Sequence, residues 1–425
     1  LVGGTVVAHA ITLLTMPIST RLFTPHDFSA LSVFSGLVGI LAIVACLRFD
    51  AAILMPENDA DAVNLLAIAI AAAVATSLLV ALVLALLPQS VLDLLKAPEL
   101  LPYMWLLPVG VFITGLYLAL QAWFVRKREF GRIARSRAGQ AAAASGVQIG
   151  MGYAGIAPLG LILGYLINYA GGVVMLLWGL LRGDRALLGQ VRWPHMRAMF
   201  KEYDRFPRYS VWEGLANGFS NSAPIILIAA MATGPEAGYL ALSLFALQAP
   251  MALLGNAIAQ VYLSEAPKAH REGRLGAYTS EVLVGLAVSG SGPMLFAAIA
   301  APTLFGLIFG EAWTRSGVLV AWMAPWFFLQ FISAPICNAL HVLGRQRLMM
   351  NFHILGMVLR IGAVLLAGFV ARDWISEARA VSGWFFYGFY LAAIVIVTQV
   401  PLSTLKTAAR RSLVPVVLAI VAGIA

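Results

Sequence analysis

Long apolar stretches constrain this sequence more than any other feature. Each is close to the 20 or so residues that a helix needs to cross the hydrocarbon core of a membrane. Twelve follow one another, and a thirteenth begins, at residues 1–20, 28–47, 62–87, 101–125, 138–155, 158–181, 209–232, 237–262, 282–309, 317–342, 352–370, 384–402 and 412–425. In lipid, backbone polar groups must be paired internally, so we expect helices. The sequence thus predicts an all-α integral membrane protein.

The scarcity of charge excludes the other fold classes. Of the 425 residues, 61% are hydrophobic and 11% are charged. A soluble domain carries about 25% charged residues, and a disordered chain has low hydrophobicity. Both cysteines, Cys46 and Cys337, lie in apolar stretches, and the six histidines show no metal-ligand spacing. We therefore expect no disulfide framework, no metal site and no cofactor.

The basic residues indicate how the helices cross the membrane. When they are counted by alternating loops, 22 of the 28 Lys and Arg residues fall on one side and five on the other. Such a bias marks the cytoplasmic side, so the first helix is expected to start in the cytoplasm. The net charge of +9 then reflects topology and contact with anionic lipid head groups, and we expect no nucleic acid partner.

The longest cytoplasmic loop, residues 182–208, contains an amphipathic segment. Between Trp193 and Phe206, apolar residues recur at helical spacing and charged residues take the other face. This pattern predicts a helix that lies in the membrane interface. The external loops are short, which disfavours a polymerase or ligase of lipid-linked sugars with catalytic groups on a large external loop.

An internal repeat predicts two lobes. The segment Thr24–Phe28 matches the segment Gly234–Tyr239, and the prolines Pro25 and Pro235 are 210 residues apart. Six spans per half is an even number, so both halves enter the membrane from the same side, as in parallel transporter repeats. We expect an N-terminal six-helix lobe, a cytoplasmic linker, a C-terminal six-helix lobe around a shared central cavity, and the start of an extra transmembrane helix, at residues 1–181, 182–208, 209–402 and 403–425.

Polar side chains inside the spans are the candidates for function. A charged group at the centre of a spanning helix costs about 2.5–3.5 kcal/mol on insertion scales, so it usually faces a cavity or a partner. In the stretch 209–232, one helical face carries Glu213, Asn217, Ser220 and Asn221. This face predicts a polar wall of the central cavity. The alternative is hydrogen bonding to a neighbouring helix.

A second polar face lies in the stretch 352–370, where His353, Gly356 and Arg360 are aligned. Arg360 lies about 12 Å inside the span. Because a guanidinium binds phosphate or carboxylate oxygens in pairs, Arg360 predicts a cationic substrate site. The alternative is a structural salt bridge, for which Glu213 is the candidate partner.

Amide side chains add candidate contacts for a sugar-like substrate, which needs many neutral donors and acceptors. Asn256 and Asn338 are two such residues in the second half. The commoner role of intramembrane amides is hydrogen bonding between packed helices. No lysine of the phosphate-loop type follows the glycine-rich stretches, so an ATPase is excluded.

Several segments resemble bacterial Wzx-type polysaccharide flippases. In the first half these are MPISTRLFTPHDF at residues 16–28 and LRFDAAI at residues 47–53. In the second half they are RFPRYS at residues 205–210, the turn at residues 234–239 and LLGNAIAQV at residues 253–261. The resemblance covers nearly the whole chain, through patterns of turns and small residues rather than a catalytic signature.

That family belongs to the multidrug/oligosaccharidyl-lipid/polysaccharide exporter superfamily. The resemblance implies a flippase, and not an enzyme, that moves an undecaprenyl-diphosphate-linked oligosaccharide to the outer leaflet by alternating access. This would serve O-antigen or exopolysaccharide synthesis in the bacterial inner membrane, alongside a polysaccharide polymerase and a chain-length regulator. Arg360 would bind the diphosphate. An ion-coupled drug or metabolite antiporter is the main alternative, although the first half lacks the intramembrane acid that such a protein needs.

Overall fold

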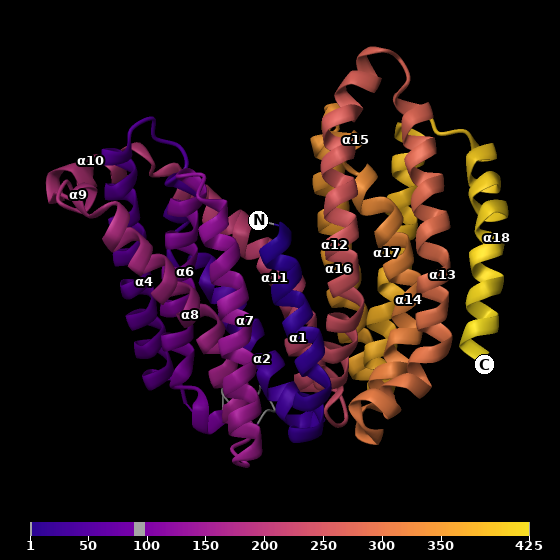
Figure 1. Cartoon of the computed structure of the whole chain (residues 1–425), viewed down its shortest axis with the longest axis horizontal. Helices are drawn as coiled ribbons and strands as arrows, with labels where there is room; N and C mark the ends of the chain where they lie inside the picture. The colour runs from indigo at the N-terminus through magenta and orange to yellow at the C-terminus, as the bar shows by residue number, and fades with distance from the viewer. Residues whose placement is uncertain (1, 89–97, 425) are drawn as a thin grey trace. The chain divides into compact units, whose positions relative to one another are not determined.

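The computed structural model describes residues 2–88 and 98–424 (Figure 1), with a few side chains inside helices, that of Asn256 among them, outside the described residues. This part of the chain contains helices and turns and no strand. Its long helices fall on the predicted apolar stretches: α1 (Val2–Leu22), α2 (Pro25–Ala45), α4 (Asp59–Leu86), α6 (Leu106–Arg126), α7 (Phe130–Tyr153), α8 (Leu159–Gly183), α11 (Val211–Met231), α12 (Glu236–Arg271), α13 (Leu275–Phe309), α14 (Thr314–Ile336), α16 (Gln346–Val370), α17 (Ile375–Val397) and α18 (Leu402–Ile424).

Nine of these helices, within the described ranges, are long and apolar enough to cross a membrane by length and composition. They are α2, α4, α6, α8, α11, α13, α14, α16 and α17, some of them counted with an adjoining turn. The other four long helices, α1, α7, α12 and α18, carry the more polar of the predicted stretches. The all-α membrane class predicted from the sequence is therefore confirmed.

Short helices connect the long ones. They are α3 (Phe49–Ala52), η2 (Leu101–Tyr103), α9 (Arg185–Leu188), α10 (Trp193–Glu202), the π-turn η3 (Phe206–Ser210), η4 (Glu311–Trp313), α15 (Asn338–Val342) and η5 (Arg372–Trp374). Local sequence explains several boundaries. At the start of α2, the Thr24 hydroxyl accepts from the Asp27 amide at 3.3 Å and the Asp27 carboxylate accepts from the Thr24 amide at 2.8 Å. With Pro25 at the first helical position, this capping box fixes the start of α2. The matching turn before α12 differs, because its N-cap is Pro235 and no side chain caps it.

The chain forms two compact units, Leu1–Ala230 and Met231–Ala425. In the first, α7 packs along α1 and α8, and α6 packs along α2, α4 and α8. Its largest core cluster surrounds the fully buried Phe49, Trp123 and Phe124. The start of α11 also belongs to this unit, because a side chain at Gly218 would overlap Ile43 of α2. The predicted lobe boundaries at residues 181 and 209 stay a prediction.

In the second unit, α13 packs along α14 and α18, and α17 packs along α14 and α16. Its core cluster includes the buried Tyr262, Phe331 and Tyr390. Figure 1 shows α12 and α13, in salmon and orange, meeting at a tip formed by the turn at residues 272–274. These are the longest helices described, with 36 and 35 residues.

The segment between α8 and α11 is held to the first unit. The buried Asn64 of α4 donates to the Gln190 carbonyl at 3.3 Å and accepts from the Arg192 amide at 3.1 Å. His195 of α10 lies 2.5 Å from the Asp61 carboxylate. One side of α10 is therefore docked on protein, while Trp193 remains 75% exposed, as an interfacial anchor would be.

Candidate functional site

Arg360 of α16 is the deepest basic residue that sequence reasoning singled out. It lies ten residues before the end of α16 at Val370, which is about 15 Å along the helix axis. Its Nε is buried and has no hydrogen-bond partner. The guanidinium carbon lies 4.9 Å from the ring centre of Phe386 on α17. Among the described residues of its own unit, no carboxylate is within ion-pair distance. The pairing with Glu213, which belongs to the other unit, stays a prediction.

A second arginine, Arg379 of α17, lies close enough to repel Arg360 electrostatically. Its side chain is 8% exposed and its Nη1 has no hydrogen-bond partner. The guanidinium carbon lies 4.4 Å from the ring centre of Trp326 on α14. Sequence reasoning missed this residue, because it placed Arg379 in an external loop before a span at residues 384–402. The structure corrects that boundary, since α17 begins at Ile375.

The missed residue had a signal in the helical spacing. Arg379, Gly383, Phe386 and Tyr387 fall at positions i, i+4, i+7 and i+8, which is one face of a helix. Tyr387 interacts electrostatically with both arginines. Arg379 is the first residue of this face and therefore belongs to the buried helix. Composition alone assigns it to a loop, because it precedes the apolar part of the helix.

Two glycines bring the aromatic rings under the guanidinium groups. A Cβ at Gly383 would lie 2.5 Å from the Trp326 ring, and a Cβ at Gly356 would lie 2.7 Å from the Phe386 ring. Each ring therefore packs directly against a helix backbone. In that position it offers its face to a cation, an attraction worth about 2 kcal/mol or more where water is excluded.

The polar face predicted for α11 is exposed. Glu213, Asn217 and Asn221 all lie on it. Asn221 donates to the Asn217 carbonyl at 3.0 Å and to its side-chain oxygen at 3.3 Å, and Ser220 donates to the Ala216 carbonyl at 2.7 Å. These bonds within the helix leave acceptor oxygens of the amides available to a ligand.

The remaining predicted residues are more scattered. His353 lies on an exposed face of α16, and Asn338 is half-buried in α15, where its amide donates to the Pro335 carbonyl at 3.3 Å. The side chain of Asn256, on α12, lies outside the described residues. In the described part of the chain, no group of three or more His, Cys, Asp and Glu side chains is arranged to hold a metal ion.

In the first unit, the motif at residues 47–53 forms a sharp turn between α2 and α3. Leu47 and Arg48 both have positive φ angles, of 49° and 64°. This left-handed conformation costs a non-glycine residue about 1–2 kcal/mol. Arg48 lies against Gly214 of α11, since a Cβ there would be 3.7 Å from its Cδ. Burial raises the pKa of Asp50, although the nearby Arg48 lowers it.

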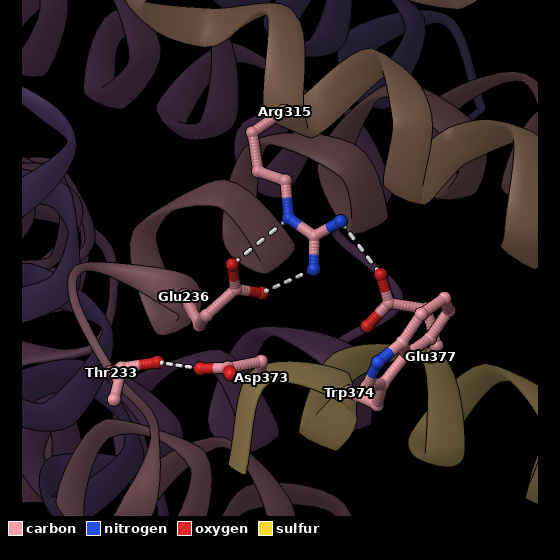
Figure 2. Close-up of a pocket in the computed structure, with 6 residues that line it drawn as sticks. All are labelled: Thr233, Glu236, Arg315, Asp373, Trp374 and Glu377. Carbon is pink, nitrogen blue, oxygen red and sulfur yellow. Dashed lines mark hydrogen bonds and ion pairs between the residues drawn. The ribbon is translucent and has the colours of Figure 1, made fainter. Parts of the chain in front are cut away.

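A separate pocket of about 340 Å³ opens in the second unit, where α12, α14 and α17 begin. Figure 2 shows Arg315 lying between the carboxylates of Glu236 and Glu377. The Arg315 Nε donates to Glu236 at 2.9 Å and its Nη1 donates to Glu377 at 2.6 Å. Ser376 donates to Glu236 at 2.6 Å, and Thr233 donates to Asp373 at 2.5 Å. This network, which sequence reasoning also missed, joins the starts of three helices.

The sequence matches one known protein family. The family described as "Polysaccharide biosynthesis protein" matches residues 18–317. No curated protein matches the sequence.

Three solved structures share the fold over nearly the whole chain. The first, a lipid II flippase MurJ in an inward closed conformation, has a TM-score of 0.71 at 11% identity and covers 98% of this chain and 91% of that one. An inward-facing multidrug resistance MATE family transporter of the MOP superfamily has a TM-score of 0.68 at 10% identity, covering 94% and 96%. A MATE transporter of Vibrio cholerae has a TM-score of 0.53 at 13% identity, covering 94% of each chain. The likeness shows the fold alone, and confirms two helical lobes with α18 as an extra C-terminal span.

Proposed function

Because the chain belongs to the polysaccharide biosynthesis protein family, we propose that it moves an undecaprenyl-diphosphate-linked oligosaccharide from the cytoplasmic to the outer leaflet of the bacterial inner membrane. The family and the fold support a lipid-linked flippase or exporter. The finer proposal is that the cargo is a repeat unit for O-antigen or exopolysaccharide synthesis and that movement occurs by alternating access. A polysaccharide polymerase and a chain-length regulator are the proposed partners.

The observation that carries the proposal is the environment of Arg360. A guanidinium deep in a spanning helix is costly without a counter-charge, and no carboxylate among the described residues of its unit pairs with it. A substrate with an anionic head group supplies that counter-charge on binding. Paired N–H donors of arginine match the oxygens of a phosphate in geometry as well as charge.

The polar faces suit the rest of the substrate. Glu213, Asn217 and Asn221 present carboxylate and amide groups to the exposed side of α11. Together with His353, Asn256 and Asn338, they are the proposed contacts of the sugar hydroxyls. The polyprenyl tail can stay in the bilayer, so the protein needs no apolar channel for it.

The substitution Arg360→Gln tests the proposal. We expect surface polysaccharide to fall at least about tenfold, because a charge-assisted hydrogen bond to the substrate is worth about 1.5–3 kcal/mol. Polysaccharide display would be measured in cells that carry the variant as their sole copy, with protein level in the membrane measured in parallel. Arg347→Gln is the matched control, since Arg347 lies exposed near the start of the same helix.

Normal display in the Arg360→Gln strain would remove this residue from the mechanism. Ion-driven efflux of a soluble cationic drug by the purified protein, with no movement of lipid-linked glycan, would favour the antiporter. Elongation of the glycan by the purified protein would favour a polymerase.

A further inference from the structure

Three buried N–H donors without acceptors gather in the second unit. They are Nε1 of Trp326, Nε of Arg360 and Nη1 of Arg379. Buried donors are almost always paired in folded proteins, because an unpaired one costs about 1–3 kcal/mol and a charged one costs more. One such atom has many explanations. Three in neighbouring side chains point to a shared acceptor that the described residues of this unit do not provide.

These donors belong to one contiguous cluster, which we call the arginine cluster: Trp326, Arg360, Arg379, Phe386 and Tyr387. Trp326 lies under Arg379, Phe386 lies under Arg360, and Tyr387 interacts with both arginines. The rings shield one side of each guanidinium from any ligand. One N–H donor of each guanidinium, Nε of Arg360 and Nη1 of Arg379, is buried and has no partner, while another part of Arg360 hydrogen-bonds Tyr387.

The charge of the cluster is not balanced by protein. The two guanidiniums carry two positive charges, and among the described residues of this unit neither forms an ion pair. Leaving a like-charged pair in a low-dielectric setting is unfavourable. A ligand with two negative charges on adjacent groups would neutralise both arginines, whereas a monoanion would leave one uncompensated.

We propose that the arginine cluster is a diphosphate-binding site in which Arg360 is the accessible arm and the enclosed Arg379 is the second arm, with the indole N–H of Trp326 as a third donor. This inference rests on the proposed function and names the residues that select a diphosphate over a monophosphate. Half-buried Arg360 meets the incoming anion first. Arg379 then binds the second phosphoryl group and accounts for the preference.

The test uses the full chain purified in detergent and titrated with inorganic pyrophosphate, with affinity read by calorimetry. We expect pyrophosphate to bind at least about tenfold more tightly than orthophosphate. Arg379→Gln should weaken pyrophosphate binding by about tenfold or more, as expected for loss of a charged hydrogen bond. It should leave orthophosphate binding nearly unchanged. Phosphatidylglycerol in mixed micelles, which presents a monophosphate head group, should compete poorly.

Two further variants keep the test decisive if Arg379→Gln fails to fold. Arg379→Lys keeps the charge but loses the planar pair of donors, so pyrophosphate affinity should fall less than in the glutamine variant. Trp326→Phe keeps the ring and removes one N–H, so affinity should fall about fivefold. Arg372→Gln is the control, because Arg372 is exposed near the same end of the helix pair and bonds the Gly368 carbonyl.

The proposal is overturned if the wild-type protein does not bind pyrophosphate. It is equally overturned if orthophosphate or phosphatidylglycerol binds as tightly, if Arg372→Gln weakens binding as much as Arg379→Gln, or if the lysine and phenylalanine variants bind like wild type. Failure of the proposed function is a different result. A protein that binds pyrophosphate through both arginines but moves no lipid-linked glycan would retain this site and lose the flippase assignment.

Discussion

Gly383 of α17 is small because the indole of Trp326 occupies the space beside it. A Cβ at this position would lie 2.5 Å from the ring, which is closer than carbon atoms approach in a packed interior. The glycine has no positive φ and lies within a regular helix, where alanine is otherwise the better residue. Packing of the arginine cluster therefore outweighs helix propensity at this position.

The substitution Gly383→Ala should accordingly lower stability. We expect a loss of about 1–3 kcal/mol from overpacking, measured as a lower thermal midpoint of the purified protein. Gly388→Ala, in the same helix, is the control, because nothing lies within 4 Å of the added Cβ. That change should be neutral or stabilising. Equal midpoints for the two variants would contradict the packing that brings Trp326 beneath Arg379.

The sequence predicts the burial of a single charged residue only where that residue lies far from both ends of an apolar stretch. Arg360 stands far from either end of an apolar stretch, so its burial could be foreseen. Arg379 and Glu377 precede the apolar core of their helix, and composition assigned them to a loop. Arg379 is buried against Trp326, and Glu377 is buried beside Arg315. Both partners lie in α14, far away in the sequence, so no local pattern predicts this burial.

Among the elements, the segment just before α10 is tied to α4 by one buried side chain, that of Asn64. Asn64 bonds the carbonyl of Gln190 and the amide of Arg192, as described above, and is 1% exposed. Its amide supplies both a donor and an acceptor, so it pairs two backbone groups of an otherwise irregular segment. The spacing of its residues predicts the amphipathic helix α10, but no local pattern predicts this contact, because Asn64 lies in an apolar stretch far earlier in the chain.

Replacing Asn64 by alanine should release that segment. We expect residues 185–192 to become more open to limited proteolysis and to amide hydrogen exchange, with a loss of about 1–3 kcal/mol from the two unpaired backbone groups. Ser77→Ala is the matched control on the same helix, since it removes a bond to the Pro108 carbonyl of α6. The control should lower stability without opening the segment. Unchanged exchange in the Asn64 variant would refute the role given to this side chain.

At the scale of the whole molecule, the apolar stretches and the basic loops predict the helices and their direction, and the structure agrees on the helices. The reason is physical, since lipid forces each segment to satisfy its own backbone. The sites follow a different rule. Glu236, Arg315 and Glu377 come from three helices, and only tertiary packing brings them together, so the pocket in Figure 2 was not foreseen.

That network should contribute strongly to the second unit. Arg315→Ala would leave the carboxylates of Glu236 and Glu377, which are 10% and 6% exposed as side chains, without their cation. Removing one partner of a buried ion pair costs about 3–5 kcal/mol, so the thermal midpoint should drop. Adding Glu236→Gln to the Arg315→Ala variant should restore part of the lost stability, because it removes one of the two unpaired carboxylates. Arg274→Ala is the control, because its pair with Glu272 is exposed and should contribute nothing measurable. An equal thermal midpoint for the Arg315 and Arg274 variants would show that the network of Glu236, Arg315 and Glu377 does not stabilise the unit.

The length of the α12–α13 hairpin has a practical consequence. At 1.5 Å per residue, the 35 residues of α13 extend about 52 Å, whereas a bilayer with its head groups is about 40–45 Å thick. The tip around Gly273, beside Lys268 and Arg271, is therefore expected to stand clear of the membrane on the predicted cytoplasmic side. A rigid soluble protein could be inserted at this tip, with its own helices continuing α12 and α13. The insertion would add mass outside the membrane and would make the particle asymmetric, which helps particle alignment in electron microscopy.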